Sequence, residues 1–155
     1  MNIGVISDTH GMLDPYAIEL LQGVDHILHA GDVGDQAVLD GLRAIAPLTA
    51  VCGNTDCWPL AAQLPTTALV ELAGRSVLLT HQRPDPDAVA RACSGSRPDA
   101  IVFGHTHRPA VDWDNGTLLF NPGSAGPKRS QRPRCVGLIE IGDELRPHII
   151  VLDQA

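Results

Sequence analysis

The chain has 155 residues, of which 44% are hydrophobic and 19% charged, and its formal net charge is −7. This length fits one domain over residues 1–155, and the recurring blocks of Ile, Val and Leu exclude a disordered chain. The aperiodic glycines and the four cysteines exclude collagen-like and disulfide-dense proteins. No apolar run approaches the roughly 18 residues of a membrane-spanning helix, and the first residues lack the basic segment of a signal peptide. We therefore expect a soluble, cytoplasmic domain that uses no membrane as a partner.

The charge balance also limits the partners of the chain. Phosphate affinity comes from basic surfaces, so the acidic net charge argues against a nucleic-acid duplex as a partner. One basic stretch holds Lys128, Arg129, Arg132 and Arg134. We interpret it as a solvated loop, with a substrate clamp as the alternative. The cysteines form no C-x-x-C pair, which excludes a zinc ribbon and a thioredoxin motif and favours free thiols in a reducing compartment.

The first third of the chain alternates strand and helix patterns. Residues 3–6 and 26–29 predict strands, and Asp14-Pro15 predicts the start of a helix between them, with Asp14 as its cap. A second helix is predicted before Pro47, because its apolar residues recur at helical spacing, and residues 48–52 predict a third strand. This order predicts a parallel sheet whose strands are buried on both faces.

The remainder is richer in strands. A helix is predicted over residues 85–93, and Asn115-Gly116 is typical of a tight hairpin turn. Apolar runs that predict strands occupy residues 68–72, 76–80, 100–103, 111–113, 117–120, 135–140 and 145–151. Two facing sheets with helices outside would bury all these runs, so we expect an α/β fold. The strands of the C-terminal hairpins could pair with a second copy, which leaves a homo-oligomer open.

Residues that can bind metals follow the ends of the predicted strands. They are Asp8, His10, Asp32, Asn54, His81, His105 and His107. Because the carboxyl ends of the strands in an open α/β sheet share one edge, these side chains are expected to converge. Their O and N donors suit Mn, Fe, Zn or Ni better than Ca or Mg. The set exceeds one coordination shell, so we predict two cations.

Two other phosphate-binding motifs are excluded at the first turn. The turn lacks the G-x-G-x-x-G sequence of a dinucleotide-binding loop, and the lone lysine, Lys128, lies too late in the chain for a P-loop. Taken singly, Asp8 and Asn54 are also ordinary turn residues. The functional interpretation therefore depends on the whole set and its order.

The same residues carry a family resemblance. Asp8-Thr9-His10, Gly31-Asp32, Gly53-Asn54, His81 and Gly104-His105-Thr106-His107 resemble the motifs of the calcineurin-like metallophosphoesterase superfamily. The length and Asn121-Pro122-Gly123-Ser124 are most similar to its small YfcE-like phosphodiesterase branch. The resemblance runs from the first strand to about Ser124. It implies a four-layer α/β/β/α sandwich of two facing mixed sheets with flanking helices, and hydrolysis of phosphoesters.

The resemblance also implies a ligand set and a mechanism. One ion would take Asp8, His10 and His107, the other would take Asn54, His81 and His105, and Asp32 would bridge the two. The implied cofactors are two divalent ions, Mn²⁺ first, with Ni²⁺, Zn²⁺, Fe²⁺ or Mg²⁺ as alternatives. Such a centre would carry net positive charge and would attract a small anionic phosphoester. A hydroxide bridging the ions would then attack a phosphodiester.

This sequence departs from the family pattern at two positions. Thr55 stands where many members have a histidine, and Gln82-Arg83 stands where the family often has Gly-His. Threonine cannot act as a general acid near pH 7, so a diester with a good leaving group would suffer least. We take Asn54, Thr55 and Arg108 as candidate substrate contacts.

Two further functions stay open, and several nearby residues have a structural interpretation. One alternative is a non-catalytic protein-binding scaffold, as in the retromer subunit that resembles this fold, although such scaffolds have lost ligands that are all present here. The other is a phosphomonoesterase or a dinucleoside polyphosphate hydrolase. Asp56 would either orient a ligand or cap its loop, and Trp58 and Pro59 are expected to pack that loop. The remaining histidines, His26, His29 and His148, are expected to be structural or solvated.

Overall fold

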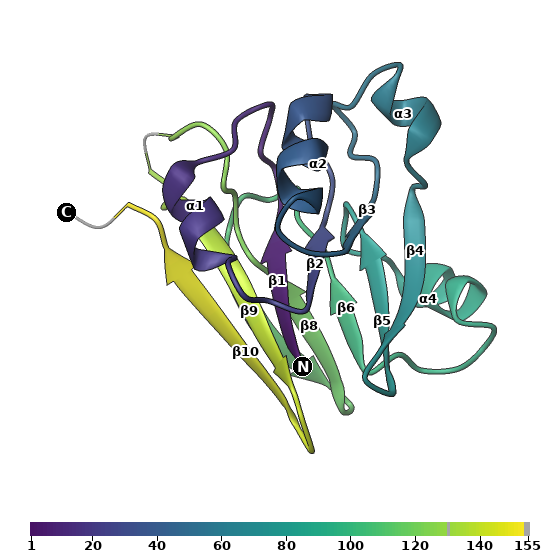
Figure 1. Cartoon of the computed structure of the whole chain (residues 1–155). Helices are drawn as coiled ribbons and strands as arrows, with labels where there is room; N and C mark the ends of the chain where they lie inside the picture. Colours follow the sequence, from purple (N-terminus) through teal and green to yellow (C-terminus); the bar gives the residue numbers. More distant parts are fainter. Residues whose placement is uncertain (130, 154–155) are drawn as a thin grey trace.

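The computed structural model describes residues 1–129 and 131–153, which build two five-stranded sheets that pack face to face (Figure 1). In spatial order, the first sheet consists of β10 (Leu145–Val151), β9 (Cys135–Ile141), β1 (Asn2–Ile6), β2 (His26–His29) and β3 (Leu48–Ala50). The second sheet consists of β4 (Thr67–Leu72), β5 (Arg75–Thr80), β6 (Ala100–Val102), β8 (Thr117–Asn121) and β7 (Ala110–Asp114). Both sheets are mixed, as expected.

Each sheet has a parallel centre and antiparallel margins. In the first sheet β1, β2 and β3 run parallel, whereas β9 and β10 form the C-terminal hairpin. In the second sheet β5, β6 and β8 run parallel, and β4 and β7 are each joined to it by a hairpin. The parallel strands place the loops that follow them at one edge of each sheet.

Three apolar clusters separate four layers, because neighbouring residues of a strand point to opposite faces. On β1, Val5 enters the cluster between the sheets, while Ile6 enters the cluster beneath the helices of the first sheet. On β5, Leu79 faces the other sheet and Leu78 faces the helix outside the second sheet. The predicted four-layer sandwich is therefore confirmed.

The helices lie outside the two sheets. They are α1 (Pro15–Leu20), α2 (Gln36–Arg43), α3 (Leu60–Gln63) and α4 (Pro86–Ala92). The cluster outside the first sheet includes residues of α1 and α2, and the cluster outside the second sheet includes residues of α4 (Figure 1). No helix among the described residues is long and apolar enough to cross a membrane.

Polar caps fix where the predicted helices begin. The side chains of Asp14, Asp35 and Asp85 each accept a hydrogen bond from a backbone N–H in the first turn of α1, α2 and α4. The helix predicted to start at Asp14-Pro15 is α1, which ends at Leu20. The short helix α3 was not predicted at all.

Candidate metal centre

The seven predicted ligands all lie on loops at the carboxyl edge of the parallel strands. Asp8 and His10 follow β1, Asp32 follows β2, and Asn54 follows β3. From the second sheet, His81 follows β5, and His105 and His107 follow β6. The contacts between these residues cross from one sheet to the other, so the two edges meet.

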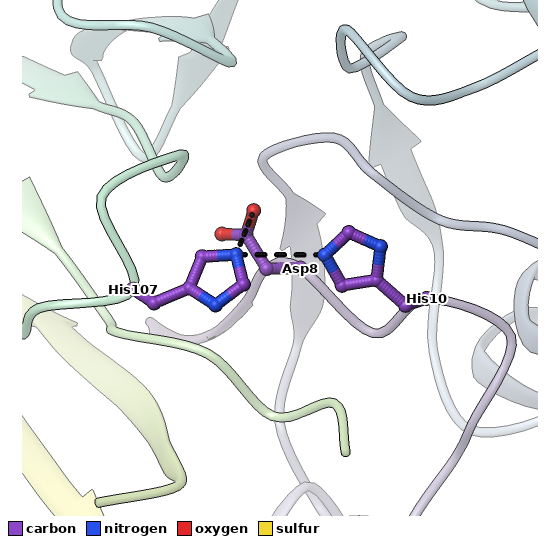
Figure 2. A group of neighbouring side chains, drawn as sticks. All are labelled: Asp8, His10 and His107. Carbon is purple, nitrogen blue, oxygen red and sulfur yellow. Dashed lines mark hydrogen bonds and ion pairs between the residues drawn. The ribbon is translucent and has the colours of Figure 1, made fainter. Parts of the chain in front are cut away.

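One group of donors consists of Asp8, His10 and His107, and one ligand atom of each lies within 4.8 Å of the others. Figure 2 shows the two imidazole rings on either side of the carboxylate. Nε2 of His107 lies 3.2 Å from Oδ1 of Asp8 and 3.4 Å from Nε2 of His10. Asp8 and His107 are buried and His10 is half-buried, so the group opens to solvent on one side.

A second group consists of Asp8, Asp32 and His81, again within 4.8 Å of one another. Oδ2 of Asp32 lies 3.3 Å from Nε2 of His81 and 3.8 Å from Nε2 of His10. Asp32 therefore stands between an imidazole of the first group and an imidazole of the second. This is the position that a carboxylate shared by two cations would need.

Asn54 links His105 to the second group through its side-chain amide. The amide oxygen Oδ1 of Asn54 lies 2.7 Å from Nε2 of His81 and 3.0 Å from Nδ1 of His105. The rings of His81 and His105 meet edge to face, with their centroids 5.2 Å apart. All seven predicted residues thus join one continuous cluster.

The hydrogen bonding of His81 tests whether this cluster fits a cation. Nδ1 of His81 lies 2.7 Å from the carbonyl oxygen of Ala30, which can only accept, so Nδ1 carries a proton. In the neutral ring Nε2 then presents a lone pair to the oxygens of Asn54 and Asp32, which also only accept. Such a concentration of lone pairs needs a positive charge, and a backbone carbonyl behind the ring is how proteins orient metal-binding imidazoles.

The pKa values of Asp32 and His81 are shifted in the directions that favour positive charge in this cluster. Burial would raise the pKa of Asp32, but hydrogen bonds from His81 and Thr55 hold that pKa well below its ordinary range. Burial would lower the pKa of His81, but the Asp32 carboxylate and the Ala30 carbonyl raise it above its ordinary value. Without a cation, a proton on His81 pairs with the Asp32 carboxylate, and a metal ion would displace that proton.

Apart from the ion-pair contact of Asp8 Oδ1 with Nε2 of His107, two buried polar atoms of the first group have no hydrogen-bond partner among the described residues. They are Oδ1 of Asp8 and Nδ1 of His107. The other oxygen of Asp8 accepts from the hydroxyl of Ser7 (2.6 Å) and from the backbone N–H of His105 (3.1 Å). Leaving a buried carboxylate oxygen unsatisfied costs free energy. The arrangement fixes one oxygen of Asp8 and presents the other, as a cation ligand would be.

Backbone strain concentrates in the same residues. Asp8, His10, Asp32, His105 and His107 all have positive φ, between 47° and 68°. This left-handed conformation is uncommon for residues other than glycine, and such strain gathers at functional sites. Among the described residues, the other non-glycine positions with positive φ are Ala73, Ser94 and Asn115, outside the cluster. Five of the seven candidate ligands therefore occupy an unfavourable backbone conformation.

Two glycines leave room for these side chains. A Cβ atom on Gly31 would lie 2.7 Å from Nδ1 of His81, and the φ of Gly31 is +94°. A Cβ atom on Gly104 would clash with the side chain of Ser7 and lie 2.6 Å from Oδ2 of Asp8. The glycines that precede Asp32 and His105 in the sequence motifs thus have a steric reason.

Asp56 and Asn121 hold the loops that carry the ligands. Asp56 accepts from the backbone N–H groups of Val33 (3.2 Å), Gly34 (2.9 Å) and Gly53 (2.9 Å), so it ties the loop after β2 to the loop after β3. This is the loop-capping role that the sequence left open. The side-chain amide of Asn121 donates to the carbonyl of Gly104 (2.9 Å) and so fixes the loop after β6. The sequence offered Asn121 only as part of a motif.

The predicted substrate contacts differ in their position. The backbone N–H of Thr55 donates to Oδ1 of Asp32 (2.9 Å), so the main chain of Thr55 touches the cluster. Arg108 is exposed beside His107. In the basic stretch, Arg132 donates to the carbonyl of Thr106, between two candidate ligands. Arg134 instead forms ion pairs with Asp14 (2.7 Å) and Asp153 (2.9 Å), so it serves the fold.

One expectation for the loop after β3 was wrong. Trp58 does not pack the loop, because 83% of its surface is exposed. Leu60, at the start of α3, is the buried residue of this segment. The indole of Trp58 stands in solvent on a loop of the candidate site.

A four-layer α/β/β/α sandwich with Asp, His and Asn gathered at the carboxyl edge of its strands is the architecture of a metallophosphoesterase. Residues 1–144 match the family described as the calcineurin-like phosphoesterase superfamily domain, and the chain belongs to this family. It is 33% identical to a probable metallophosphoesterase of Methanocaldococcus jannaschii, in an alignment that covers 99% of this chain and 83% of that protein. The predicted family is therefore confirmed.

Several solved structures share the fold. An archaeal phosphodiesterase superposes with a TM-score of 0.83 at 23% identity, covering 98% of this chain and 100% of that one. YfcE, a phosphoesterase from E. coli, gives a TM-score of 0.69 at 24% identity, covering 90% and 88%. Vps29 from Chaetomium thermophilum gives 0.77 at 21% identity, covering 98% and 97%. These likenesses extend the fold to enzymes and to Vps29 alike.

Proposed function

We propose that this metallophosphoesterase-family protein hydrolyses phosphodiesters with the help of two divalent cations, Mn²⁺ first. The observation that carries the proposal is the position of Asp32, whose carboxylate lies between His10 and His81. Asp8, His10 and His107 would hold one cation, and Asn54, His81 and His105 would hold the other. We extend the proposal to residues 1–155 as a single cytoplasmic catalytic domain.

The charge of the site makes the cations a requirement. Asp8 and Asp32 are buried carboxylates at the centre of the cluster, and alone they would repel an anionic phosphoester. Bound divalent cations would act as Lewis acids towards the phosphoryl oxygens and lower the pKa of coordinated water. The protein's own part is to fix the donors: Ser7 holds one oxygen of Asp8, and the Ala30 carbonyl holds the ring of His81.

The residues around the cluster favour a small substrate with a good leaving group. Thr55 offers a hydroxyl and no acid near pH 7, so protonation of the leaving group has no obvious donor at that position. The exposed Arg108, next to His107 in the chain, would contact a phosphoryl oxygen of the substrate. Phosphomonoesters and dinucleoside polyphosphates are the alternative substrates.

A protein-binding scaffold is the second candidate function, because Vps29 shares the fold. The filled ligand set favours the enzyme, since pairwise contacts link all seven predicted donors into one cluster. Five of these donors stand in a strained backbone conformation, and such strain gathers at functional sites.

Metal removal and replacement test the proposal. The protein is stripped with a chelator, Mn²⁺, Ni²⁺, Zn²⁺ or Mg²⁺ is added separately, and hydrolysis of bis(p-nitrophenyl) phosphate and p-nitrophenyl phosphate is measured. We expect activity only with added metal, and more on the diester than on the monoester. Activity in the chelated protein would overturn the metal requirement, and a preference for the monoester would overturn the substrate class.

Variants of the cluster provide the second arm. Asp32→Asn and His105→Ala should lower turnover by about 10- to 100-fold, because the first removes the negative charge and one of the two oxygens of the shared carboxylate and the second removes a nitrogen donor. The matched control is His148→Ala, since His148 is exposed on β10 and pairs with Glu140 (3.2 Å). Equal activity of Asp32→Asn and His148→Ala would count against the assigned centre.

A further inference from the structure

Trp58 is the most exposed large apolar side chain among the described residues. Its exposed fraction is 83%, whereas the next, Trp113 and Leu69, reach 49% and 48%. Water disfavours so large an apolar surface, and an indole in a fold of this size is normally much more buried. The position of Trp58 therefore calls for a reason outside the packing of the fold.

The loop that carries Trp58 is anchored on both sides. Before it, Asp56 accepts three backbone N–H groups, and the backbone N–H of Asp56 donates to the carbonyl of Gly53 (3.3 Å). After it, Leu60 is buried and begins α3, and the N–H of Ala61 donates to the carbonyl of Cys57 (2.9 Å). The exposed indole thus stands on a fixed support, so a ligand that packs on it need not order the loop.

This loop borders the candidate metal centre. Trp58 follows Asn54 by four residues, so their Cα atoms are at most roughly 15 Å apart. The turn closed between Gly53 and Asp56 shortens that separation, and the N–H of Thr55 binds Asp32 directly. Since β3 is the edge strand of the first sheet, the loop forms one end of the site.

The surroundings of Trp58 favour a small aromatic ligand over a protein partner. Protein docking surfaces need contiguous apolar area, of several hundred Å². Trp58 is the one large exposed apolar side chain of the described segment between β3 and β4. A single flat indole beside a candidate phosphoester site offers enough surface for one heterocyclic ring of a ligand to stack on it.

We propose that Trp58 is a stacking platform for a nucleobase, so that the phosphodiesters hydrolysed here are nucleotide-like. This inference rests on the proposed function and narrows its substrate. Every base presents a flat face to an indole, so the contact selects nucleotides as a class without selecting one base. The phosphoryl group would lie at the cluster, and the base would extend past Asn54 and Thr55 towards Trp58.

Two esters with the same leaving group test the proposal in the Mn²⁺-loaded enzyme. They are thymidine 5′-(p-nitrophenyl phosphate) and methyl p-nitrophenyl phosphate, which differ in the nucleoside. The ratio of their kcat/KM values should fall roughly 5- to 150-fold in Trp58→Ala, the range of one base stacked on an aromatic ring. Trp58→Phe should retain most of the ratio. An unchanged ratio in Trp58→Ala, whether both rates fall or neither does, would overturn the stacking role.

Trp113 supplies the matched control, because it is an exposed indole on β7 near the hairpin turn at the far end of the second sheet. Trp113→Ala should leave the ratio unchanged. If Trp113→Ala lowered the ratio as much as Trp58→Ala does, the effect would be unspecific and the proposal would fail.

Fluorescence supplies a readout that needs no turnover. In Trp113→Phe, Trp58 is the only indole of the chain, since the sequence contains two tryptophans. With Mg²⁺ present, adenosine 5′-monophosphate should quench its emission in a saturable way, and ribose 5-phosphate should not. Equal responses to both compounds, or none to either, would contradict stacking.

The two assays separate the inference from the function on which it rests. Hydrolysis of the methyl ester by the wild-type enzyme depends on the metal centre and supports phosphodiester hydrolysis by itself. If the methyl ester is hydrolysed but the ratio of kcat/KM values does not change in Trp58→Ala, the stacking role is wrong and the proposed function stands. If neither ester is hydrolysed in any metal, the proposed function fails, and the fluorescence titration alone decides whether Trp58 binds a base.

Discussion

The amide oxygen of Asn54 lies 2.7 Å from Nε2 of His81, and the two residues come from different sheets. Asn54 lies on the loop after the edge strand β3 of the first sheet, whereas His81 directly follows β5 of the second. The ring of His81 is held from behind by the carbonyl of Ala30, which also belongs to the first sheet's loops. The candidate centre therefore forms only when the two sheets pack together, and the distances between its donors depend on how the sheets are aligned.

Removing Asn54 should uncouple the two groups of ligands. In Asn54→Ala we expect the protein to bind one Mn²⁺ per chain in place of two, with affinity at the weaker site reduced more than tenfold, because His81 and His105 lose their shared partner. Elemental analysis after equilibrium dialysis measures the stoichiometry. Asn2→Ala, at an exposed position at the start of β1, is the control. Two tightly bound ions in Asn54→Ala would refute the assignment.

Gly31→Ala should disturb His81 from its other side. The new Cβ would lie 2.7 Å from Nδ1 of His81 and would adopt a φ of +94°, so we expect a loss of at least about 1–2 kcal/mol of stability together with weaker metal binding. Urea unfolding and metal titration measure the two effects. Gly142→Ala is the matched control, because a Cβ there would meet no atom within 4 Å. Wild-type metal affinity in Gly31→Ala would show that the carbonyl and the ring tolerate displacement.

The sequence predicted the candidate ligands better than it predicted the contacts that hold the ligands and their loops in place. The ligands could be found because Asp8, Asp32 and Asn54 each follow an apolar run, and the geometry of parallel sheets sends such residues to one edge. The contact between His81 and the Ala30 carbonyl could not be found, because any residue type offers a carbonyl. The pairing of Arg134 with Asp14 joins residues 120 positions apart, so the local sequence of the basic stretch does not disclose it.

The loop after β3 shows where the sequence pattern misleads. Trp58 and Leu60 are both large and apolar, and hydrophobicity alone favours burial of both. Leu60, at the start of α3, takes the buried position, whereas Trp58 stands in solvent. Hydrophobic patterns predict which residues can be buried, and only packing decides which residue is.

His29 should make the stability of the fold depend on pH. Burial lowers the pKa of His29 to about 4, and its Nδ1 accepts from the N–H of Gly31 (3.1 Å) while its Nε2 faces the hydroxyl of Thr9 (3.0 Å). That hydroxyl donates to the carbonyl of Val33 (2.9 Å), so the bonds require a neutral ring with its proton on Nε2. His29 is therefore structural, as the sequence led us to expect.

The sign of the effect follows from this lowered pKa. Above pH 6.5 the ring is neutral in both the folded and the unfolded chain, and its contribution to stability is fully present. As the pH falls from about 6.5 to about 4, only the unfolded chain takes up the proton, and about 3 kcal/mol of stability is lost. Urea unfolding of the chelated protein at pH 7 and pH 4.5 should show a smaller decrease for His29→Asn than for the wild type. His148→Asn, at an exposed site, should decrease like the wild type; parallel curves for His29→Asn would disprove the assignment.

Thr55→His should introduce an acid beside the candidate metal centre. The side chain of Thr55 is exposed and its backbone N–H donates to Asp32, so this main-chain bond persists when an imidazole replaces the hydroxyl, while the side-chain bond from the hydroxyl to Asp32 is lost. A neutral-pH acid assists poor leaving groups more than good ones. Hydrolysis of methyl phenyl phosphate should therefore rise at least about tenfold relative to methyl p-nitrophenyl phosphate. The rate for the phenyl ester should also decrease above a pH of about 6.5, where the new histidine loses its proton.

Thr55→Asn is the control: it introduces a polar side chain with no titratable proton and should leave the ratio of the two rates unchanged. If Thr55→Asn and Thr55→His change the ratio equally, the gain comes from altered substrate binding, and the residue at this position is not what limits protonation of the leaving group.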